Sequence, residues 1–350
     1  MKNFNLPWAS GTKYWICIAL SEGENSSAID AKYSKKGKLL EGNIYVIEAP
    51  KKWAASWKDI KKTLKTANYD RPQAAVIPND GGDVNYDKIY DQLKSVDEWD
   101  NIAENMWLAE AMLEDRLTCH FQPIFDRNNQ AFGVESFVRV EEKNGETIGG
   151  GKIIEACYQL RIHHIIDKHL QVKAIEKFAE CKVPGSLFIN FITGFIQLPS
   201  KYLEKLSEAT QEHDVMPKRI VLDVSKSDHV EDVSQVASVV DFCNSKGYSV
   251  ALDDVKSLEQ LSEILNETKP DFVKIDRGLT YNFEKPLIKD KIQKLIEYSH
   301  SKGCMVLAEG IEDKKTYDYL KDAGIDLFQG YYLAKPMPAE EINRALKKVG

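Results

Sequence analysis

From residue 117 onward, short apolar runs alternate with longer segments of helical composition. The runs are LTCHFQPIF, AFGVESFVRV, SLFINFI, RIVLDVS, YSVALDD, DFVKID, CMVLAEG and IDLFQGYY. From the second run onward, segments such as PSKYLEKLSEATQEHD separate nearly all of them. Strands that alternate with helices indicate a parallel sheet, and eight strands are the number that closes a (β/α)8 barrel.

The first two runs are too close together for a helical crossover. The sequence DRNNQ between them predicts a hairpin turn, so one strand of this pair should run antiparallel to the others. The predicted fold class is therefore α/β, with residues 113–350 forming a modified (β/α)8 TIM-type barrel that contains one antiparallel strand.

Residues 1–112 follow a different pattern. The apolar runs at 14–20 and 42–49 predict strands, and the segments 53–65 and 97–116 have the spacing of packed helices. Turn-forming residues from Ile77 to Lys88 predict a loop. We predict a small α+β N-terminal domain without catalytic residues, through which the chain could form a homodimer or contact a protein partner.

Polar side chains stand at or just past the ends of the barrel strands. From the second run to the eighth, they are Glu135, Asn190, Asp223, Asp253 with Asp254, Lys274 with Asp276, Glu309 and Gln329. Barrel enzymes build their active sites from the carboxyl ends of strands, so we expect these side chains to converge on one mouth.

A ring of carboxylates is unstable unless cations neutralise it. Oxygen ligands suit Mg²⁺ or Mn²⁺, and two such ions could share Asp253, activate water and stabilise the oxygens of a phosphodiester. Lys274 would stay charged among the acids and could orient the water or act as a base. For any single acid, a helix N-cap is the more common role, and Asp254 or Asp276 alone fits that interpretation.

The composition of the chain limits its class. With 43% hydrophobic and 29% charged residues, the 350-residue chain has the character of a soluble globular protein. Its net charge of −7 gives no indication of DNA binding, and its apolar run YWICIAL is too short to span a membrane. Six cysteines without a Cys-x-x-Cys pair indicate reduced thiols. A cytoplasmic location is the prediction.

The ordered set of motifs gives a family resemblance. FQPIF, GVESFVRV, FINF, VLDVS, ALDD, VKID, LAEGIE and QGYYLAKPMP appear in the order found in the EAL domain, the bacterial cyclic di-GMP phosphodiesterase family. The region from about Leu117 to Val349 resembles this domain. The resemblance implies a (β/α)8-type barrel and Mg²⁺- or Mn²⁺-dependent opening of cyclic di-GMP to the linear dinucleotide pGpG.

The resemblance also implies roles for individual residues. It implies metal ligands at Glu135, Asn190, Asp223, Asp253 and Asp254, with Glu309 and Gln329 nearby and Glu312 in support. It places Lys274 on the attacking water as a catalytic residue together with Glu135 and Glu309. It places Gln122, Arg139, Asp276 and Gln329 in the substrate-binding site, with the guanidinium of Arg139 on a phosphate.

The chain departs from the family pattern at three places. The family has Glu at position 223 and again three residues later, where this chain has Asp223 and Lys226. The family also has Asp-Asp-Phe-Gly-Thr-Gly where this chain has DDVKSLE, so the loop Val255–Glu259 lacks both glycines. Two functions therefore stay open: a cyclic di-GMP phosphodiesterase, whose activity these departures could lower, or a receptor that binds cyclic di-GMP with little or no hydrolysis. A third alternative is a protein-interaction scaffold.

Overall fold

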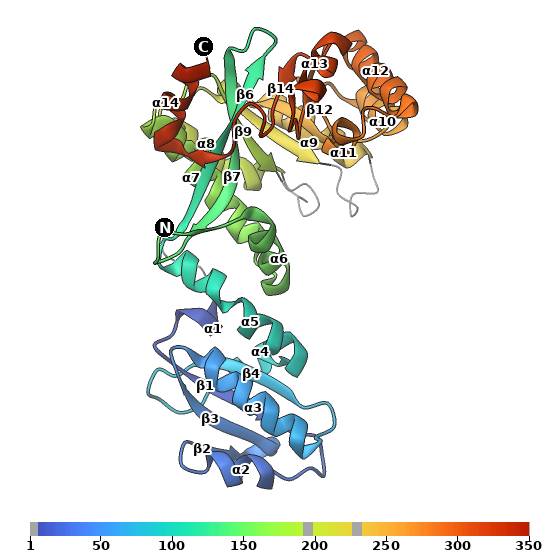
Figure 1. Cartoon of the computed structure of the whole chain (residues 1–350). Coiled ribbons are helices and arrows are strands. Elements are labelled where there is room, and N and C mark those ends of the chain that lie inside the picture. Colours follow the sequence, from blue (N-terminus) through green and yellow to red (C-terminus); the bar gives the residue numbers. More distant parts are fainter. Residues whose placement is uncertain (1–5, 192–198, 226–232, 350) are drawn as a thin grey trace. The chain divides into compact units, whose positions relative to one another are not determined.

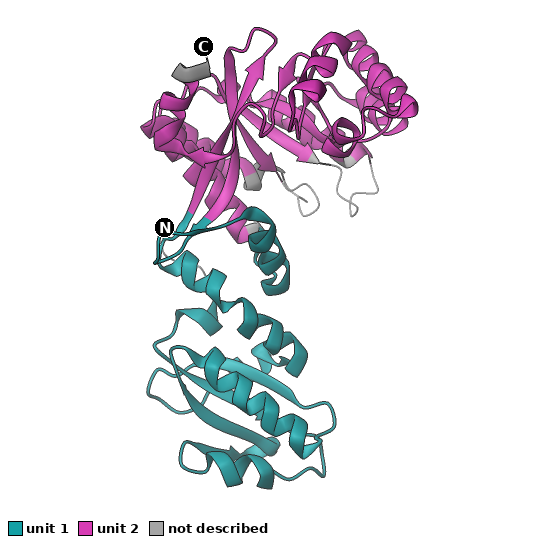
Figure 2. Cartoon of the chain, in the orientation of Figure 1, with its two compact units in different colours: residues 1–117, 140–163 teal, residues 118–139, 164–350 magenta. Residues whose placement is uncertain are grey.

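The computed structural model describes residues 6–191, 199–225 and 233–349 (Figure 1). The chain forms two compact units: residues 1–117 with 140–163, and residues 118–139 with 164–350 (Figure 2). The two units are defined by which residues pack together, and they carry no information about function. The predicted boundary between domains at residues 112 and 113 therefore stays a prediction.

The first unit is built on an antiparallel sheet with the strand order β2-β3-β1-β4-β5. The strands are β1 (Lys13–Ala19), β2 (Gly37–Leu40), β3 (Ile44–Pro50), β4 (Gln73–Pro78) and β5 (Lys94–Ser95). Helix α2 (Ser27–Tyr33) joins β1 to β2, and α3 (Trp53–Ala67) joins β3 to β4. This β-α-β-β-α-β order is that of the split βαβ arrangement.

Tryptophans link the helices of this unit to its sheet. Trp53 and Trp57 of α3 and Trp99 of α5 (Val96–Leu113) are fully buried. The rings of Trp53 and Trp99 meet edge to face with centroids 5.6 Å apart, and Trp99 Nε1 donates to the backbone oxygen of Ala74 on β4. A separate cluster of sheet side chains, which includes Cys17, Val46 and Ala75, contains Ile89 of α4 (Tyr86–Gln92).

The predicted elements of residues 1–112 are mostly found, with two corrections. The two strands and two helices correspond to β1, β3, α3 and α5. The segment predicted as a loop is wrong at both ends, because β4 extends to Pro78 and α4 begins at Tyr86. Strand β4 is not among the predicted strands, since alanine has a low strand propensity and its two alanines are favoured there only because the sheet buries them. Other elements of this unit are α1 (Pro7–Ser10), η1 (Glu41–Asn43), β8 (Thr147–Ile148) and α6 (Gly150–Leu160).

The second unit contains the predicted closed barrel of eight strands. The strands are β6 (Leu117–Asp126), β7 (Ala131–Glu141), β9 (Ser186–Phe191), β10 (Ile220–Ser225), β11 (Ser249–Val255), β12 (Phe272–Ile275), β13 (Met305–Ala308) and β14 (Leu327–Phe328). Strands β7 and β9–β14 are parallel from neighbour to neighbour, while β6 is antiparallel to β14 and pairs with β7 to close the ring. The prediction of one antiparallel strand is confirmed.

Helices follow most of the barrel strands. They are α7 (His163–Glu180), α8 (Pro199–Glu212), α9 (Val233–Ser245), α10 (Leu258–Glu267), α11 (Arg277–Tyr281), α12 (Pro286–Ser301), α13 (Lys314–Ala323) and α14 (Ala339–Val349). The short elements η3 (Pro217–Arg219) and β15 (Met337–Pro338) complete the unit. Residues such as Leu222, Val250 and Val306 point outward from the strands into the main core that these helices cover. Within the described ranges, no helix has the length and apolar character needed to cross a bilayer.

Candidate functional site

Inside the barrel, an apolar layer lies next to a polar layer. Alternating strand residues form the apolar layer, namely Ile124, Phe188, Val221, Ala251, Phe272, Leu307 and Leu327. Because side chains alternate along a strand, the residue two positions on points to the same side. On the parallel strands, the residues two positions after the apolar ones are Asn190, Asp223, Asp253, Lys274, Glu309 and Gln329. On the antiparallel strand β6, the corresponding residue is two positions before Ile124, namely Gln122. The predicted site residues therefore form the next layer, at the carboxyl ends of the parallel strands.

Lys274 of β12 is at the centre of this polar layer. Its ammonium lies 2.6 Å from Glu309 Oε1, 2.9 Å from Asp223 Oδ2, 3.3 Å from Glu135 Oε2 and 3.4 Å from Asp253 Oδ1. The lysine side chain is 0% exposed. We call these five residues the Lys274 cluster. Since it contains four carboxylates and one ammonium, negative charge is in excess.

The electrostatics of the Lys274 cluster follow from burial and from this imbalance. Burial raises the pKa of Asp223 and Glu309 well above the ordinary range, and the attraction of Lys274 only partly offsets it. The pKa of Glu135 is raised for the same reason. Burial lowers the pKa of Lys274, but the four carboxylates outweigh burial and hold its pKa well above the ordinary value. The lysine is therefore a fixed positive charge.

Asp253 and Asp254 are separated by a bulge in β11. The pairing with β12 shifts register between Leu252 and Val255, so both aspartates lie opposite the single residue Lys274. Asp254 has a φ of 57°, in the left-handed region, and its N–H donates to Asp253 Oδ1 at 2.9 Å. Asp253 thereby points into the Lys274 cluster, while the exposed Asp254 is not paired with the lysine.

The loop that departs from the family pattern is short and ordered. Strand β11 continues to Val255, and the Ser257 hydroxyl caps α10 by accepting from Gln260 N. The side chain of Gln260 in turn accepts from Lys256 N at 3.1 Å. Asp254 is the residue of positive φ in this segment, so the loop reaches its helix without a glycine. Lys226 lies outside the described residues.

Two of the predicted substrate-binding residues, Gln122 and Arg139, donate hydrogen bonds to backbone oxygens of the protein. Gln122 is buried and donates from Nε2 to Ala334 O at 2.9 Å. Arg139 is half-buried and donates to Val138 O, and burial lowers the pKa of its guanidinium while nearby Tyr331 opposes this. Tyr331 is not among the site residues predicted from the sequence; it is 57% exposed and follows the eighth strand in the QGYY motif. That motif is the signal that could have identified it.

The remaining predicted residues are distributed around the Lys274 cluster. Asn190 is exposed and lies beside Asp223 in the pairing of β9 with β10. Asp276 is the N-cap of α11, with Oδ1 accepting from Gly278 N, so the helix-cap alternative is confirmed for it. Gln329 is buried and its side chain counteracts the raised pKa of Glu135. Glu312 is exposed and makes no ion pair with Lys274.

A close backbone approach fixes the ends of β13 and β14. Gln329 N donates to Ala308 O, and Ile311 N donates to Gln329 O. A Cβ atom on Gly330 would come within 2.0 Å of Ile311 O. Only glycine fits at position 330, and this contact holds Glu309 and Gln329 on neighbouring strands.

The oxygen-rich Lys274 cluster suits hard divalent cations. Asp223 Oδ1 is buried and accepts no hydrogen bond within the described part of the chain, and Glu135 Oε2 is buried beside the ammonium of Lys274 at 3.3 Å. Carboxylate oxygens are the ligands that Mg²⁺ and Mn²⁺ prefer. In the described ranges, no three acidic, histidine or cysteine side chains already surround one metal-sized point. The donor chemistry thus fits, and an ion would have to share carboxylates with the ammonium of Lys274.

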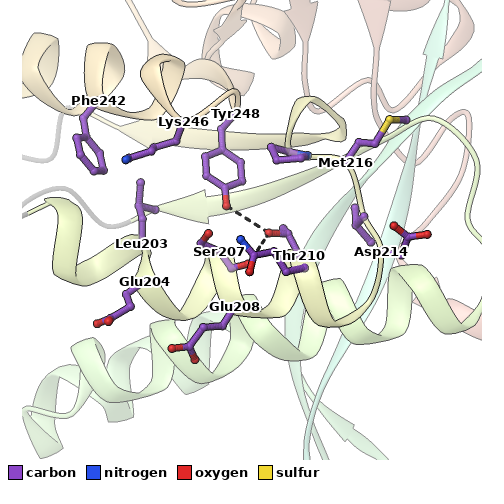
Figure 3. Close-up of a pocket in the computed structure, with 13 residues that line it drawn as sticks. Leu203, Glu204, Ser207, Glu208, Thr210, Asp214, Met216, Phe242, Lys246 and Tyr248 are labelled. Carbon is purple, nitrogen blue, oxygen red and sulfur yellow. Dashed lines mark hydrogen bonds between the residues drawn. The ribbon is translucent and has the colours of Figure 1, made fainter.

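A separate pocket of about 910 Å³ lies between α8 and α9 (Figure 3). Figure 3 shows Tyr248 and Thr210 at its base, with their hydroxyls 3.4 Å apart, and Phe242 and Lys246 on one side. Tyr248 directly precedes β11, so the pocket is at the opposite strand end from Asp253. It shares no residue with the Lys274 cluster, and we do not place the functional site there.

Comparison with known proteins places this barrel in a family. The model of the EAL domain family matches residues 105–336. The signaling protein YkoW of Bacillus subtilis (strain 168) is 25% identical over 264 residues, which are 69% of this chain and 31% of YkoW. The cyclic di-GMP phosphodiesterase PdeF of Escherichia coli (strain K12) is 20% identical over 242 residues, which are 68% of this chain and 32% of PdeF.

A solved structure has the same fold. The cyclic di-GMP-bound form of a standalone versatile EAL protein from Vibrio cholerae O395 superposes with a TM-score of 0.58 and 28% identity. The match covers 64% of this chain and 93% of that protein. The chain therefore spans about a third of the length of the curated relatives it matches, and nearly all of the solved domain. The family match extends over more than half of the sequence, and this chain belongs to the EAL domain family.

Proposed function

We propose that this chain hydrolyses cyclic di-GMP to linear pGpG with the help of Mg²⁺ or Mn²⁺. The observation that carries the proposal is the Lys274 cluster, in which four carboxylates surround one buried ammonium at the carboxyl ends of the strands of an EAL barrel. The relatives named cyclic di-GMP phosphodiesterases and the cyclic di-GMP-bound neighbour support this substrate.

Two ions would be held by the oxygen atoms of Glu135, Asn190, Asp223, Asp253 and Asp254. Asp253 would be a central ligand in this proposal, because its carboxylate lies in the Lys274 cluster, 3.4 Å from the ammonium. When bound, the ions supply charge neutralisation and activation of water at the phosphodiester. The raised pKa values of Glu135 and Asp223 fit this role, since a divalent cation would offset the burial and, to a smaller extent, the repulsion between acids that raise them.

The other residues of the chain bind and orient the substrate in this proposal. The guanidinium of Arg139 is rigid and half-buried, and its fork geometry suits two phosphate oxygens. Gln122, Asp276 and Gln329 complete the substrate contacts. The ammonium of Lys274 stays charged, donates hydrogen bonds to the attacking water and stabilises negative charge as it develops on the phosphate. Before any ion binds, Glu309 is the carboxylate nearest to this ammonium, at 2.6 Å.

Chromatography tests the proposed reaction. Purified protein with Mn²⁺ or Mg²⁺ should convert cyclic di-GMP to pGpG, and Glu135→Ala should reduce turnover by at least about a hundredfold. Glu141→Ala is the matched control, because Glu141 is an exposed acid at the end of the same strand. Full turnover in Glu135→Ala would show that the reaction occurs elsewhere.

A receptor that binds cyclic di-GMP without turnover is the second candidate function. It is favoured by Asp223, which has one methylene less than the family's Glu, is 0% exposed and bonds Lys274. A carboxylate withdrawn into the barrel is a poorer ligand for an ion at the mouth. Micromolar binding of cyclic di-GMP without any pGpG, in the presence of either metal, would support the receptor. Recovery of turnover in Asp223→Glu would then identify this residue as the cause.

A further inference from the structure

The acids of the Lys274 cluster differ in how far they face solvent. The side chains of Asp223 and Glu135 are 0% and 4% exposed, whereas those of Asp253 and Glu309 are 16% and 19% exposed. An ion that enters from solvent therefore meets Asp253 and Glu309 first. Both of these carboxylates are already paired with the ammonium of Lys274.

Four carboxylates packed this closely need a cation in order to remain in the barrel. Lys274 meets this need, since its Nζ lies within 3.4 Å of all four. The ammonium of Lys274 is covalently part of the chain and is always present to pair with these carboxylates, whereas a divalent ion must come from solution. Each of the four carboxylates is thus paired with this one ammonium in the metal-free site, and the excess negative charge remains.

We infer that Lys274 is the resident cation of the metal-free site and that divalent ions bind by competing with it for Asp253 and Glu309. Two cations within about 4 Å repel each other, so an ion placed among these carboxylates must move the ammonium from at least one of them. Asp223 accepts a hydrogen bond from Lys274 at 2.9 Å and is the most buried of the four acids. This contact keeps the ammonium in the barrel when the ammonium moves away from Asp253 and Glu309. The inference rests on the proposal that this site binds metal, but it does not depend on turnover.

Calorimetric titration with Mn²⁺ alone tests the competition. Lys274→Met should bind Mn²⁺ at least about tenfold more tightly than wild type, and Lys274→Arg, which keeps the charge, should not gain affinity. Lys246→Met is the control for a general loss of positive charge, because Lys246 precedes β11 at the opposite strand end from Asp253. Equal or weaker Mn²⁺ binding by Lys274→Met would overturn the inference.

A measurement on the wild-type protein covers the case in which Lys274→Met does not fold. In protein labelled with ¹³C at lysine Cε, the signal absent from Lys274→Arg reports on Lys274. Titration with Mg²⁺ should shift this signal in step with Mg²⁺ binding measured by calorimetry. Binding without a shift would overturn the competition while leaving the metal site intact. Failure of both ions to bind to wild type and to both variants would overturn the metal site and, with it, this inference.

Discussion

The different environments of the adjacent residues Asp253 and Asp254 in the ALDD motif depend on one backbone angle. Asp254 adopts a φ of 57°, which side chains with a Cβ atom disfavour and which Asp and Asn tolerate better than most. This angle accompanies the register shift in β11, which leaves Asp253 paired with Lys274 and Asp254 exposed. The family pattern places glycines just after the Asp pair, whereas in this chain an aspartate itself has the positive φ.

The positive φ of Asp254 should make the free energy of unfolding depend on which residue replaces it. In metal-free protein, Asp254→Val should lower the free energy of unfolding by about 1–2 kcal/mol relative to Asp254→Gly, because valine is strained at positive φ. Chemical denaturation measures the difference. At the exposed neighbour Lys256, whose φ is not positive, Val should be no worse than Gly. The same preference at both positions would contradict the role of the backbone angle.

The cysteines give a second prediction for individual residues. Five of the six thiols are buried, and burial raises the pKa of Cys17, Cys119 and Cys243 to about 12. Reactive thiolate is therefore scarce at pH 8. We expect a thiol reagent such as DTNB to label at most the half-buried Cys181 in the native protein and all six cysteines after denaturation. Rapid native labelling in Cys181→Ser would contradict this arrangement.

At the scale of elements, helix α3 is anchored to the first unit through its tryptophans. Trp53 Nε1 donates to Trp8 O at 2.6 Å, while Trp57 Nε1 is buried with no hydrogen-bond partner in the described part of the chain. The two side chains are equally buried and lie four residues apart on one helix. They therefore form a matched pair that differs in one hydrogen bond.

Replacing each tryptophan by phenylalanine should separate packing from hydrogen bonding. Trp53→Phe leaves the carbonyl of Trp8 unpaired, so it should lower the local opening free energy by about 1 kcal/mol more than Trp57→Phe. Hydrogen–deuterium exchange of the amides in β3 and β4 measures this opening. Equal losses in the two variants would mean that the hydrogen bond contributes no net stability.

At the scale of the whole molecule, metal binding, protonation and stability are linked. The raised pKa values of Glu135, Asp223 and Glu309 mean that the metal-free protein retains protons that free carboxyls would lose. Because the folded-state pKa values exceed the unfolded values, this contribution to stability is complete below the ordinary carboxyl pKa of about 4. It falls as pH rises through the folded-state values.

Metal binding should therefore release protons, and Mn²⁺ affinity should rise with pH. A cation favours the ionised carboxylates and displaces the retained protons. Calorimetry at pH 6, 7 and 8, in buffers with different heats of ionisation, counts the released protons. Glu309→Gln should release fewer protons than wild type. Affinity that does not change with pH, without proton release, would contradict the linkage.

Much of the barrel could be predicted because its signals are local. The alternation of apolar runs with helical segments gave the number and order of the strands, and the polar residues at the strand ends form one layer as expected. Strand periodicity explains this agreement, since Asp223, Asp253, Lys274 and Glu309 each stand two positions after an apolar residue of the barrel interior. Strand β4, with its alanine pair, lacked such a local signal.

The sequence by itself determined the family, the order of the barrel strands and the set of acids around one lysine. Only the tertiary structure decided how these charges pair. Lys274 meets four carboxylates that lie on or just past four other strands, whereas Asp276 caps α11 and Asp254 is exposed. The physical reason is that Glu135 and Glu309, far apart in the chain, come together only when the barrel closes. Strand periodicity fixes the side of a strand that a residue occupies, but closure and the bulge in β11 fix which residues meet.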